Sequence, residues 1–216
     1  MIDRFCDYLT NKIRKEMPDV DDERAEVIKY GLQLMIGEIP KIFIMAAIAW
    51  ILGIFKCTVI CFALVLPYRM YSGGFHLKTH IGCIIGTSLM YTGNAFISQY
   101  ITIPFMYKVV FGIILWIFSV IMIHLYAPAD TENVPVISKR ERKKRKIMSY
   151  ILMSIMIIAG VLINNNTISN ILLIGVLLQT ISITRLAYKL TNNKYGYEIY
   201  MENKSKATVN WNIIDR

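Results

Sequence analysis

The stretch VVFGIILWIFSVIMI, residues 109–123, contains no charged residue and decides the fold class. Similar uncharged runs cover residues 42–55, 147–163 and 168–183. Each run approaches the roughly 20 residues that an α-helix needs to cross the hydrocarbon core of a bilayer. The whole chain of 216 residues is 55% hydrophobic with a mean hydropathy of +0.46, which is far above an ordinary soluble domain. We therefore expect an all-α, polytopic integral membrane protein built as a helical bundle.

Six hydrophobic segments can be distinguished on either side of this stretch. The second segment is short, and the third is diluted by Gly, Ser, Thr, Asn and Gln residues. Hydropathy therefore predicts about six transmembrane helices and leaves open four spans with a half-immersed central region. The segments are residues 30–54, 57–68, 81–104, 109–127, 147–163 and 168–187.

The basic residues fall mainly on one side of a six-span arrangement. The N-terminal region, the 69–80 loop, the 128–146 loop and the C-terminal region together hold 21 of the 24 Lys and Arg residues. The positive-inside rule places such regions in the cytoplasm. We therefore expect a multi-pass cell-membrane protein with both termini in the cytoplasm, and its net charge of +9 requires no nucleic-acid partner. Four spans give a similar split, so this pattern predicts orientation more directly than span number.

The first 18 residues have the spacing of an amphipathic helix rather than of a signal peptide. Their apolar residues recur at intervals of three and four, and their cations could meet lipid headgroups. A helix lying on the membrane surface and a helix packed on the protein's own body are both compatible with this pattern. We divide the chain into this helix, a membrane-embedded domain over residues 19–190 and a cytoplasmic tail over residues 191–216.

The run KRERKKRK, residues 139–146, is the most basic stretch of the chain and predicts a cytoplasmic loop. Anionic lipid headgroups are one partner for such a loop. An acidic peptide segment is another, and the two are compatible. Lys143, Lys144 and Arg145 are the candidate contacts within the run.

Potentially reactive residues gather in YRMYSGGFHLKTHIGC, residues 68–83, where Cys83 follows His76 by seven positions. A histidine can take the proton of a cysteine thiol and leave a nucleophilic thiolate. On one straight helix the two residues would stand about 10.5 Å apart along the axis, too far for a hydrogen bond. Pairing therefore predicts a bend between them, and Gly73 and Gly74 just upstream indicate irregular backbone. Irregular backbone at membrane depth also predicts a cavity, open here to the cytoplasm.

Other interpretations of this stretch remain open. His80, three residues before Cys83, could be the base instead, because residues i and i+3 are neighbours on a helix. A metal site of His76, His80 and Cys83 would lack both a fourth ligand and the glutamate of an HExxH motif, so we predict neither metal nor cofactor. If the stretch has no catalytic or metal-binding role, one histidine would lie at the membrane interface and Cys83 would simply pack against its neighbours.

Charged residues near the stretch have two interpretations each. Arg69 could extend toward lipid headgroups or bind a carboxylate or an oxyanion. Glu38 lies deep in the first segment with Lys41 three residues on. Intramembrane charges usually face a partner or a cavity, so Glu38 either pairs with Lys41 or orients a catalytic histidine.

The stretch and the hydrophobic segment after it resemble the accessory gene regulator B (AgrB) family, the membrane cysteine peptidases of Gram-positive quorum sensing. A second similarity lies in YAPADTENVP, residues 126–135, which resembles the Pro-rich segment of that family and precedes a basic loop, as it does there. Val134 departs from the lysine common in the family. The layout is similar over roughly residues 25–190. The residues that carry the first similarity are Arg69, Ser72, Gly73, Gly74, His76 and Cys83.

The resemblance implies a membrane-embedded cysteine endopeptidase with Cys83 as nucleophile, His76 as general base and His80 as an accessory residue. The substrate would be an AgrD-like propeptide, whose acidic C-terminal tail Cys83 would release to leave an acyl thioester. A cysteine or serine of the peptide would then close a thiolactone or lactone ring. Arg69 and the Ser72–Gly74 stretch would support the substrate or the backbone, and the basic run could bind the tail. We also expect a homodimer.

Two other classes compete with this interpretation. A small transporter or exporter would need polar residues along several spans, whereas only the third segment is visibly polar. A non-catalytic signalling subunit would tolerate replacement of Cys83.

Overall fold

The computed structural model describes residues 2–17, 20–77, 79–132 and 135–214, and within these ranges the chain is helical without named strands. Outside the helices, a parallel bridge pairs Gly73 with Ala129. The helices are α1 (Ile2–Glu16), α2 (Asp22–Ile51), α3 (Phe55–Ser72), α4 (His80–Ser88), the π-helix η1 (Leu89–Gly93), α5 (Asn94–Tyr100), α6 (Phe105–Tyr126), α7 (Lys139–Leu162), α8 (Asn166–Ser182), α9 (Arg185–Leu190) and α10 (Gly196–Ile214).

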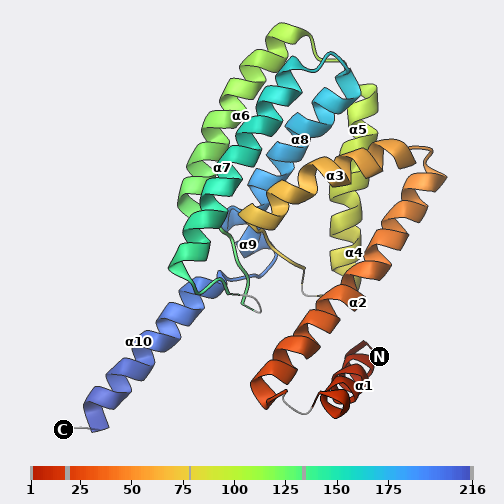
Figure 1. Ribbon diagram of the computed structural model, residues 1–216. Coiled ribbons are helices and arrows are strands. Elements are labelled where there is room, and N and C mark those ends of the chain that lie inside the picture. Colours follow the sequence, from red (N-terminus) through yellow and green to blue (C-terminus); the bar gives the residue numbers. More distant parts are fainter. Residues whose placement is uncertain (1, 18–19, 78, 133–134, 215–216) are drawn as a thin grey trace.

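The long helices form a bundle in which α6, α7 and α8 lie side by side (Figure 1). Helix α3 crosses this layer at a slant and packs on α7 and α8. The line of α4, η1 and α5 packs on α8 and α3, and α2 covers its outer side. Helices α6, α7 and α8 run antiparallel to one another in sequence order, and their connections alternate between the two ends of the bundle (Figure 1).

One end of the bundle collects the segments that carry the predicted chemistry. The 73–79 loop, the 127–138 segment, α9 and the start of α10 all lie at this end, together with α1 (Figure 1). The 101–104 and 163–165 turns lie at the opposite end. The fold thus brings residues about 110 positions apart in sequence to one place.

The interior combines apolar packing with hydrogen-bonded polar groups. Tyr68, Ser119 and Thr180 form a buried chain in which each hydroxyl pair is 3.0 Å apart. The Asn94 amide donates to Cys61 Sγ at 3.3 Å and to the Ile171 carbonyl at 3.1 Å. Polar side chains between helices need such partners when water is absent.

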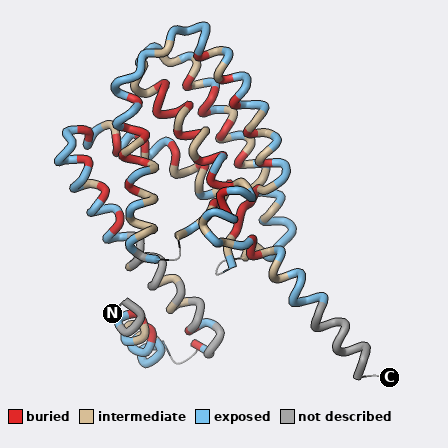
Figure 2. Tube along the Cα trace, turned by 180° about the vertical axis from the view of Figure 1, so that it is seen from behind, coloured by how far each residue is buried: buried red, intermediate tan, exposed pale blue. Residues whose placement is uncertain are grey.

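The outer surface of the bundle carries large apolar side chains, and the buried residues lie along the inner faces of the helices (Figure 2). Trp50, Ile51 and Met106 are each more than 70% exposed. Exposed apolar area on this scale marks a membrane-facing surface. Three stretches of the described residues are long and apolar enough to cross a membrane: Ile81–Tyr100, Phe105–Tyr126 and Lys139–Leu162. This is a membrane protein.

Four of the predicted hydrophobic segments fall mainly within one helix each, residues 81–104 fall mainly within the interrupted line of α4, η1 and α5, and residues 168–187 cover most of α8 and the start of α9. The apolar helices Ile39–Ile51 and Asn166–Ser182 are shorter than a full span. The number of six spans therefore stays a prediction, as does the cytoplasmic side of the termini.

The N-terminal segment is helical, and α1 packs against α2. Cys6 and Thr10 are buried, and Lys29 forms an ion pair of 2.5 Å with Asp7. Packing on the protein's own body, one of the two predicted arrangements, is thus present. Contact of α1 with a membrane surface stays a prediction.

We predicted a loop for the basic run 139–146, but these residues form the first two turns of α7. The Ser138 hydroxyl accepts a hydrogen bond of 3.4 Å from the Glu141 backbone N–H. Ser138 and Glu141 have the S-x-x-E spacing of a capping box, which begins a helix at this point. The prediction was wrong because it gave the dense positive charge of the run more weight than this local helix signal.

Candidate functional site

The backbone changes direction between Ser72 and Thr79. Helix α3 ends at Gly73, which has φ 77° and ψ −151°, and Gly74 has φ 143°. Such conformations are essentially restricted to glycine. Helix α4 then begins at His80, where Thr79 Oγ1 accepts from the Gly82 N–H at 3.1 Å. The predicted bend between His76 and Cys83 is confirmed, since His76 lies in the connection and Cys83 in the first turn of α4.

The two glycines are held against the segment that follows α6. The Gly74 N–H donates to the Ala129 carbonyl at 2.9 Å, and the Ala129 N–H donates to the Ser72 carbonyl at 2.8 Å. A Cβ atom on Gly73 would overlap the backbone carbonyl of Ala129. The YAPADTENVP segment therefore touches the glycine turn directly; its Val134 lies outside the described residues.

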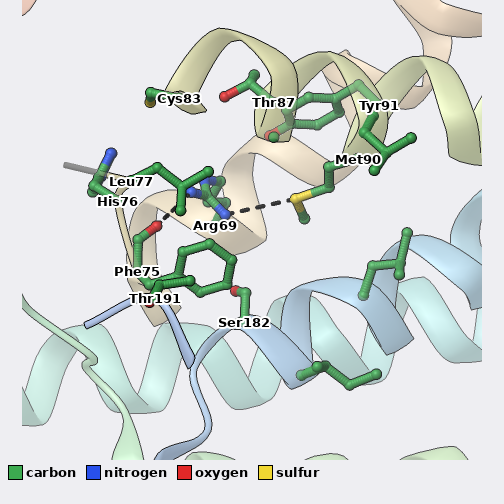
Figure 3. Close-up of a pocket in the computed structure, with 14 residues that line it drawn as sticks. Arg69, Phe75, His76, Leu77, Cys83, Thr87, Met90, Tyr91, Ser182 and Thr191 are labelled. Carbon is green, nitrogen blue, oxygen red and sulfur yellow. Dashed lines mark hydrogen bonds between the residues drawn. The ribbon is translucent and has the colours of Figure 1, made fainter. Parts of the chain in front are cut away.

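A cavity of about 350 Å³ opens beside this turn and is lined by Arg69, His76 and Cys83 (Figure 3). His76 is exposed and Cys83 is half-buried. Figure 3 shows both at the same end of the cavity, with His76 on the loop and Cys83 on α4. A second cavity of about 220 Å³ shares these three residues and extends toward α2, where Lys41 lines it. The predicted cavity is therefore present, and the histidine and the cysteine border it together.

Most of the wall of the larger cavity is apolar. Such a lining excludes water from a bound apolar ligand and strengthens electrostatic interactions at its polar points. The apolar side chains come from the loop, η1 and α8, and they are Phe75, Leu77, Leu89, Met90, Leu178 and Ile181.

Arg69 supplies a positive charge to both cavities. Its Nη1 donates to Gln179 Oε1 at 3.2 Å and to Met90 Sδ at 3.6 Å, and its Nη2 donates to the Phe75 carbonyl at 3.2 Å. Of the two interpretations of Arg69, extension toward lipid headgroups does not fit, because these acceptors hold the guanidinium inside the bundle (Figure 3). In this position it can attract a carboxylate or a developing oxyanion.

A group of polar residues secures the segment that holds the glycine turn. Tyr188 OH donates to the carbonyls of Ala129 and Asp130 at 2.9 and 3.1 Å. Burial raises the pKa of Tyr188 well above its usual range, so this hydroxyl keeps its proton and remains a donor. The Asp130 carboxylate, only 2% exposed, forms an ion pair of 3.0 Å with Arg142. Arg142 in turn lies over the ring of Tyr197, 4.1 Å from its centroid.

The start of the predicted tail also touches the site. Thr191 lines the larger cavity, and the Asn193 amide donates to the His76 carbonyl at 2.8 Å. Tyr195 stacks on Tyr188 with ring centroids 4.2 Å apart, which fixes the chain before α10. The loop with His76 is therefore held by contacts from three different parts of the chain.

Several predicted residues lie away from the cavities or cannot be placed. Lys143 and Lys144 are exposed and Arg145 is half-buried, all within the first two turns of α7. The side chains of Glu38 and His80 lie outside the described residues. Among the described side chains, no group of three His, Cys, Asp or Glu comes close enough to hold a metal ion.

Gln179 and Asn193 are parts of the site that sequence reasoning missed. Gln179 is an amide in an otherwise apolar segment, and such a residue usually pairs with another helix. That signal was present in the sequence, although it does not identify the partner. For Asn193, which lies in a polar segment, no such signal exists.

The chain is similar over most of its length to proteins of one family. The sequence profile described as "Accessory gene regulator B" matches residues 6–183. This chain belongs to the accessory gene regulator B family. An AgrB-like protein of Listeria innocua is 33% identical to this family member over 200 residues, covering 92% of this chain and 94% of the relative. The Accessory gene regulator protein B of Staphylococcus aureus is 25% identical over 182 residues, covering 84% and 91%. No solved structure matches this family member.

Family membership gives the chain a role in quorum-sensing autoinducer processing. The matched region contains the loop with His76, the whole of α4 and the segment around Asp130. It ends at Ile183, so Tyr188 and Asn193, the donors of two contacts to the site, lie outside the matched residues.

Proposed function

We propose that this chain is a membrane cysteine endopeptidase that acts on an AgrD-like propeptide, with Cys83 as nucleophile and His76 as general base. The observation that carries the proposal is that His76, Cys83 and Arg69 line one mostly apolar cavity in a member of the accessory gene regulator B family. The competing transporter and non-catalytic classes give no reason for these three residues to meet.

The reaction would begin with transfer of the Cys83 thiol proton to the His76 imidazole. The thiolate attacks the carbonyl carbon of the scissile peptide bond and forms a C–S bond, while the carbonyl oxygen takes the negative charge. Cys83 lies in the first turn of α4, where the positive end of the helix dipole favours an anion. The Arg69 guanidinium is the nearby cation for the oxyanion.

Collapse of the tetrahedral intermediate breaks the C–N bond. The leaving amine takes the proton from the His76 imidazolium, and the C-terminal tail departs while the rest of the peptide remains as a thioester on Cys83. A thiol or hydroxyl of the same peptide then gives its proton to His76 and attacks that carbonyl to form the ring bond. The C–S bond to Cys83 breaks, its electron pair goes to the sulfur, and the proton returns from His76 to the thiolate. An apolar cavity disfavours the competing attack by water.

The partners of this reaction are part of the proposal. The exposed Lys143 and Lys144 would attract the acidic tail, or anionic lipid when no peptide is bound. The catalytic end of the bundle would face the cytoplasm, where the propeptide is made. A homodimer is also proposed, on the resemblance alone.

The test is co-expression of the chain with an AgrD-like propeptide, followed by gel analysis and mass spectrometry. Cys83→Ala and His76→Ala should abolish cleavage, whereas Cys57→Ala and His124→Ala should not. Cys57 is a half-buried free cysteine on α3 and His124 an exposed histidine on α6, so they are matched controls. A peptide containing Cys83 whose mass is increased by that of the propeptide without its tail would support the acyl thioester. Persistent cleavage by Cys83→Ala would overturn the peptidase proposal.

A further inference from the structure

Gln179 joins Arg69 to the glycine turn through both ends of its side-chain amide. The residue is fully buried in α8. Its Oε1 accepts from Arg69 Nη1 at 3.2 Å, and its Nε2 donates to Ser72 Oγ at 2.9 Å and to the Gly73 carbonyl at 2.6 Å. One side chain thus contacts the cation of the cavity and the turn that leads to His76.

This combination of contacts requires an amide. An amide offers an acceptor oxygen and a donor nitrogen on adjacent atoms, whereas a carboxylate only accepts and a thioether does neither well. The Arg69 guanidinium needs an acceptor, and the Gly73 carbonyl needs a donor. Glutamine therefore satisfies both groups with one side chain.

The surroundings leave the turn little room to move relative to Arg69. A Cβ atom on Gly74 would stand 2.8 Å from Ser182 Oγ, 3.5 Å from Arg69 Nη1 and 3.6 Å from Gln179 Nε2. The Phe75 N–H reaches the Ser182 carbonyl at 3.4 Å, and the Ser182 hydroxyl donates to the Gln179 carbonyl at 2.7 Å. The C-terminal end of α8 is therefore the platform on which the residues before His76 rest.

We propose that Gln179 is a positioning residue that holds Arg69 and the His76 loop in a fixed relation to Cys83. The proposal rests on the function proposed above and deepens it. Gln179 lies behind Arg69 and the turn, and it acts through them. Loss of the amide would let Arg69 and the Gly73 carbonyl move independently. The position of His76 relative to Cys83 would then no longer be fixed.

Two substitutions separate the two halves of the amide. Gln179→Met keeps an unbranched side chain of similar size but removes all three hydrogen bonds of the amide. Gln179→Glu keeps an acceptor for Arg69 and opposes the Gly73 carbonyl with a second oxygen. Because both variants lose the donor to the Gly73 carbonyl, we expect both to lower the first-order rate of propeptide cleavage about 100-fold. This is the effect on rate of misplacing a reacting group by about 1 Å.

A second readout does not depend on the propeptide. The rate at which iodoacetamide alkylates Cys83 follows its thiolate fraction, so its pH profile reports the partnership with His76. Peptide mass spectrometry of the full chain in detergent resolves Cys83 from the other three cysteines. We expect both Gln179 variants to shift this profile toward that of His76→Ala.

The control is Asn170→Leu. Asn170 is also a fully buried amide on α8 and donates to the carbonyls of Ser98 and Ile101 at 3.2 and 2.6 Å. It lies near the opposite end of the helix, so its loss should destabilise the fold without changing the alkylation profile.

The outcomes are distinct. If His76→Ala shifts the profile but both folded Gln179 variants keep the wild-type profile, the positioning role is overturned and the peptidase proposal stands. If Gln179 and Asn170 variants lose cleavage equally and keep the same profile, the role of Gln179 is structural only, which also overturns the proposal. If His76→Ala itself leaves the profile unchanged, the Cys83–His76 pair fails, and the positioning proposal fails with it.

Discussion

The side-chain amide of Asn193 donates a hydrogen bond of 2.8 Å to the backbone carbonyl of His76, although 117 positions separate the two residues. The same amide donates to Thr191 Oγ1 at 2.9 Å, which orients it toward the loop. The connection between α9 and α10 therefore contacts the loop at His76, whereas α8 contacts the residues just before it. A peripheral segment thus contributes to the geometry around the histidine.

We predict that Asn193→Ala slows propeptide cleavage about fivefold, because one hydrogen bond contributes about 1 kcal/mol and this is a factor of about five. Asn193→Asp should have the same effect, since a carboxylate cannot donate to the His76 carbonyl. The neighbouring Asn192 has φ 55° and is exposed, so Asn192→Gly is the matched control and should retain the wild-type rate. Equal rates for the Asn193 and Asn192 variants would contradict a role for this contact.

Gly73→Ala adds only a methyl group but should strongly reduce both stability and activity. The backbone conformation at Gly73 costs a non-glycine residue about 1–3 kcal/mol, and the new Cβ would meet the Ala129 carbonyl. We expect a lower melting temperature in detergent and loss of cleavage. In Gly31→Ala, by contrast, the new Cβ meets nothing within 4 Å, and the helix should become more stable by about 0.5–1 kcal/mol. The prediction fails if both variants melt alike.

The ion pair between Asp130 and Arg142 should contribute strongly to stability. Side-chain exposure is 2% for Asp130 and 23% for Arg142, so Asp130→Ala leaves a partly buried cation without its partner. Breaking such a pair costs about 3–5 kcal/mol when it is well buried, and we expect the lower end here. The measurement is thermal unfolding of Asp130→Ala, Arg142→Met and the double variant.

The exposed pair Arg185–Glu198 is the control for this experiment. Its side chains are 66% and 61% exposed, so Glu198→Ala should cost about 0–1 kcal/mol. A cost for Asp130→Ala as small as this would show that the segment before α7 is held by its backbone contacts alone.

The features that sequence predicts best are local ones. Uncharged runs of 14 or more residues predict helices because a buried backbone in lipid must satisfy its own hydrogen bonds. The bend before Cys83 follows from helix geometry and two adjacent glycines. Even the start of α7 was encoded locally, in the Ser138–Glu141 spacing, but the charge of the run suggested a loop.

The features that sequence predicts poorly are pairings between distant residues. Nothing near Gln179 in the sequence indicates that its partners are Arg69 and the Ser72–Gly73 turn, more than 100 positions away. The contact between Asn193 and His76 is of the same kind. These pairings depend on how α3 crosses α8, which follows from tertiary packing rather than from any local pattern.

Charge reversal on the first turns of α7 should weaken recognition of the acidic tail. Lys143→Glu and Lys144→Glu together should raise the propeptide concentration for half-maximal cleavage, with a smaller effect at high salt because exposed charges are screened. Lys56→Glu is the control, since Lys56 is exposed on α3 away from the catalytic end. A propeptide that lacks its acidic residues should not distinguish the variants. If it does, the basic turns act on the membrane rather than on the tail.

The side of the membrane on which Thr102 lies tests the predicted orientation of the bundle. Thr102 is exposed in the turn between α5 and α6, at the end of the bundle opposite the cavity (Figure 1). With six spans and a cytoplasmic cavity, Thr102→Cys should react with a membrane-impermeant maleimide in intact cells, in a background with Cys57→Ala. Ser138→Cys, at the catalytic end, should react only after permeabilisation. Labelling of Thr102→Cys only after permeabilisation would instead place this turn on the cytoplasmic side and overturn the predicted orientation, because a maleimide that cannot cross the bilayer reports the side on which a residue lies.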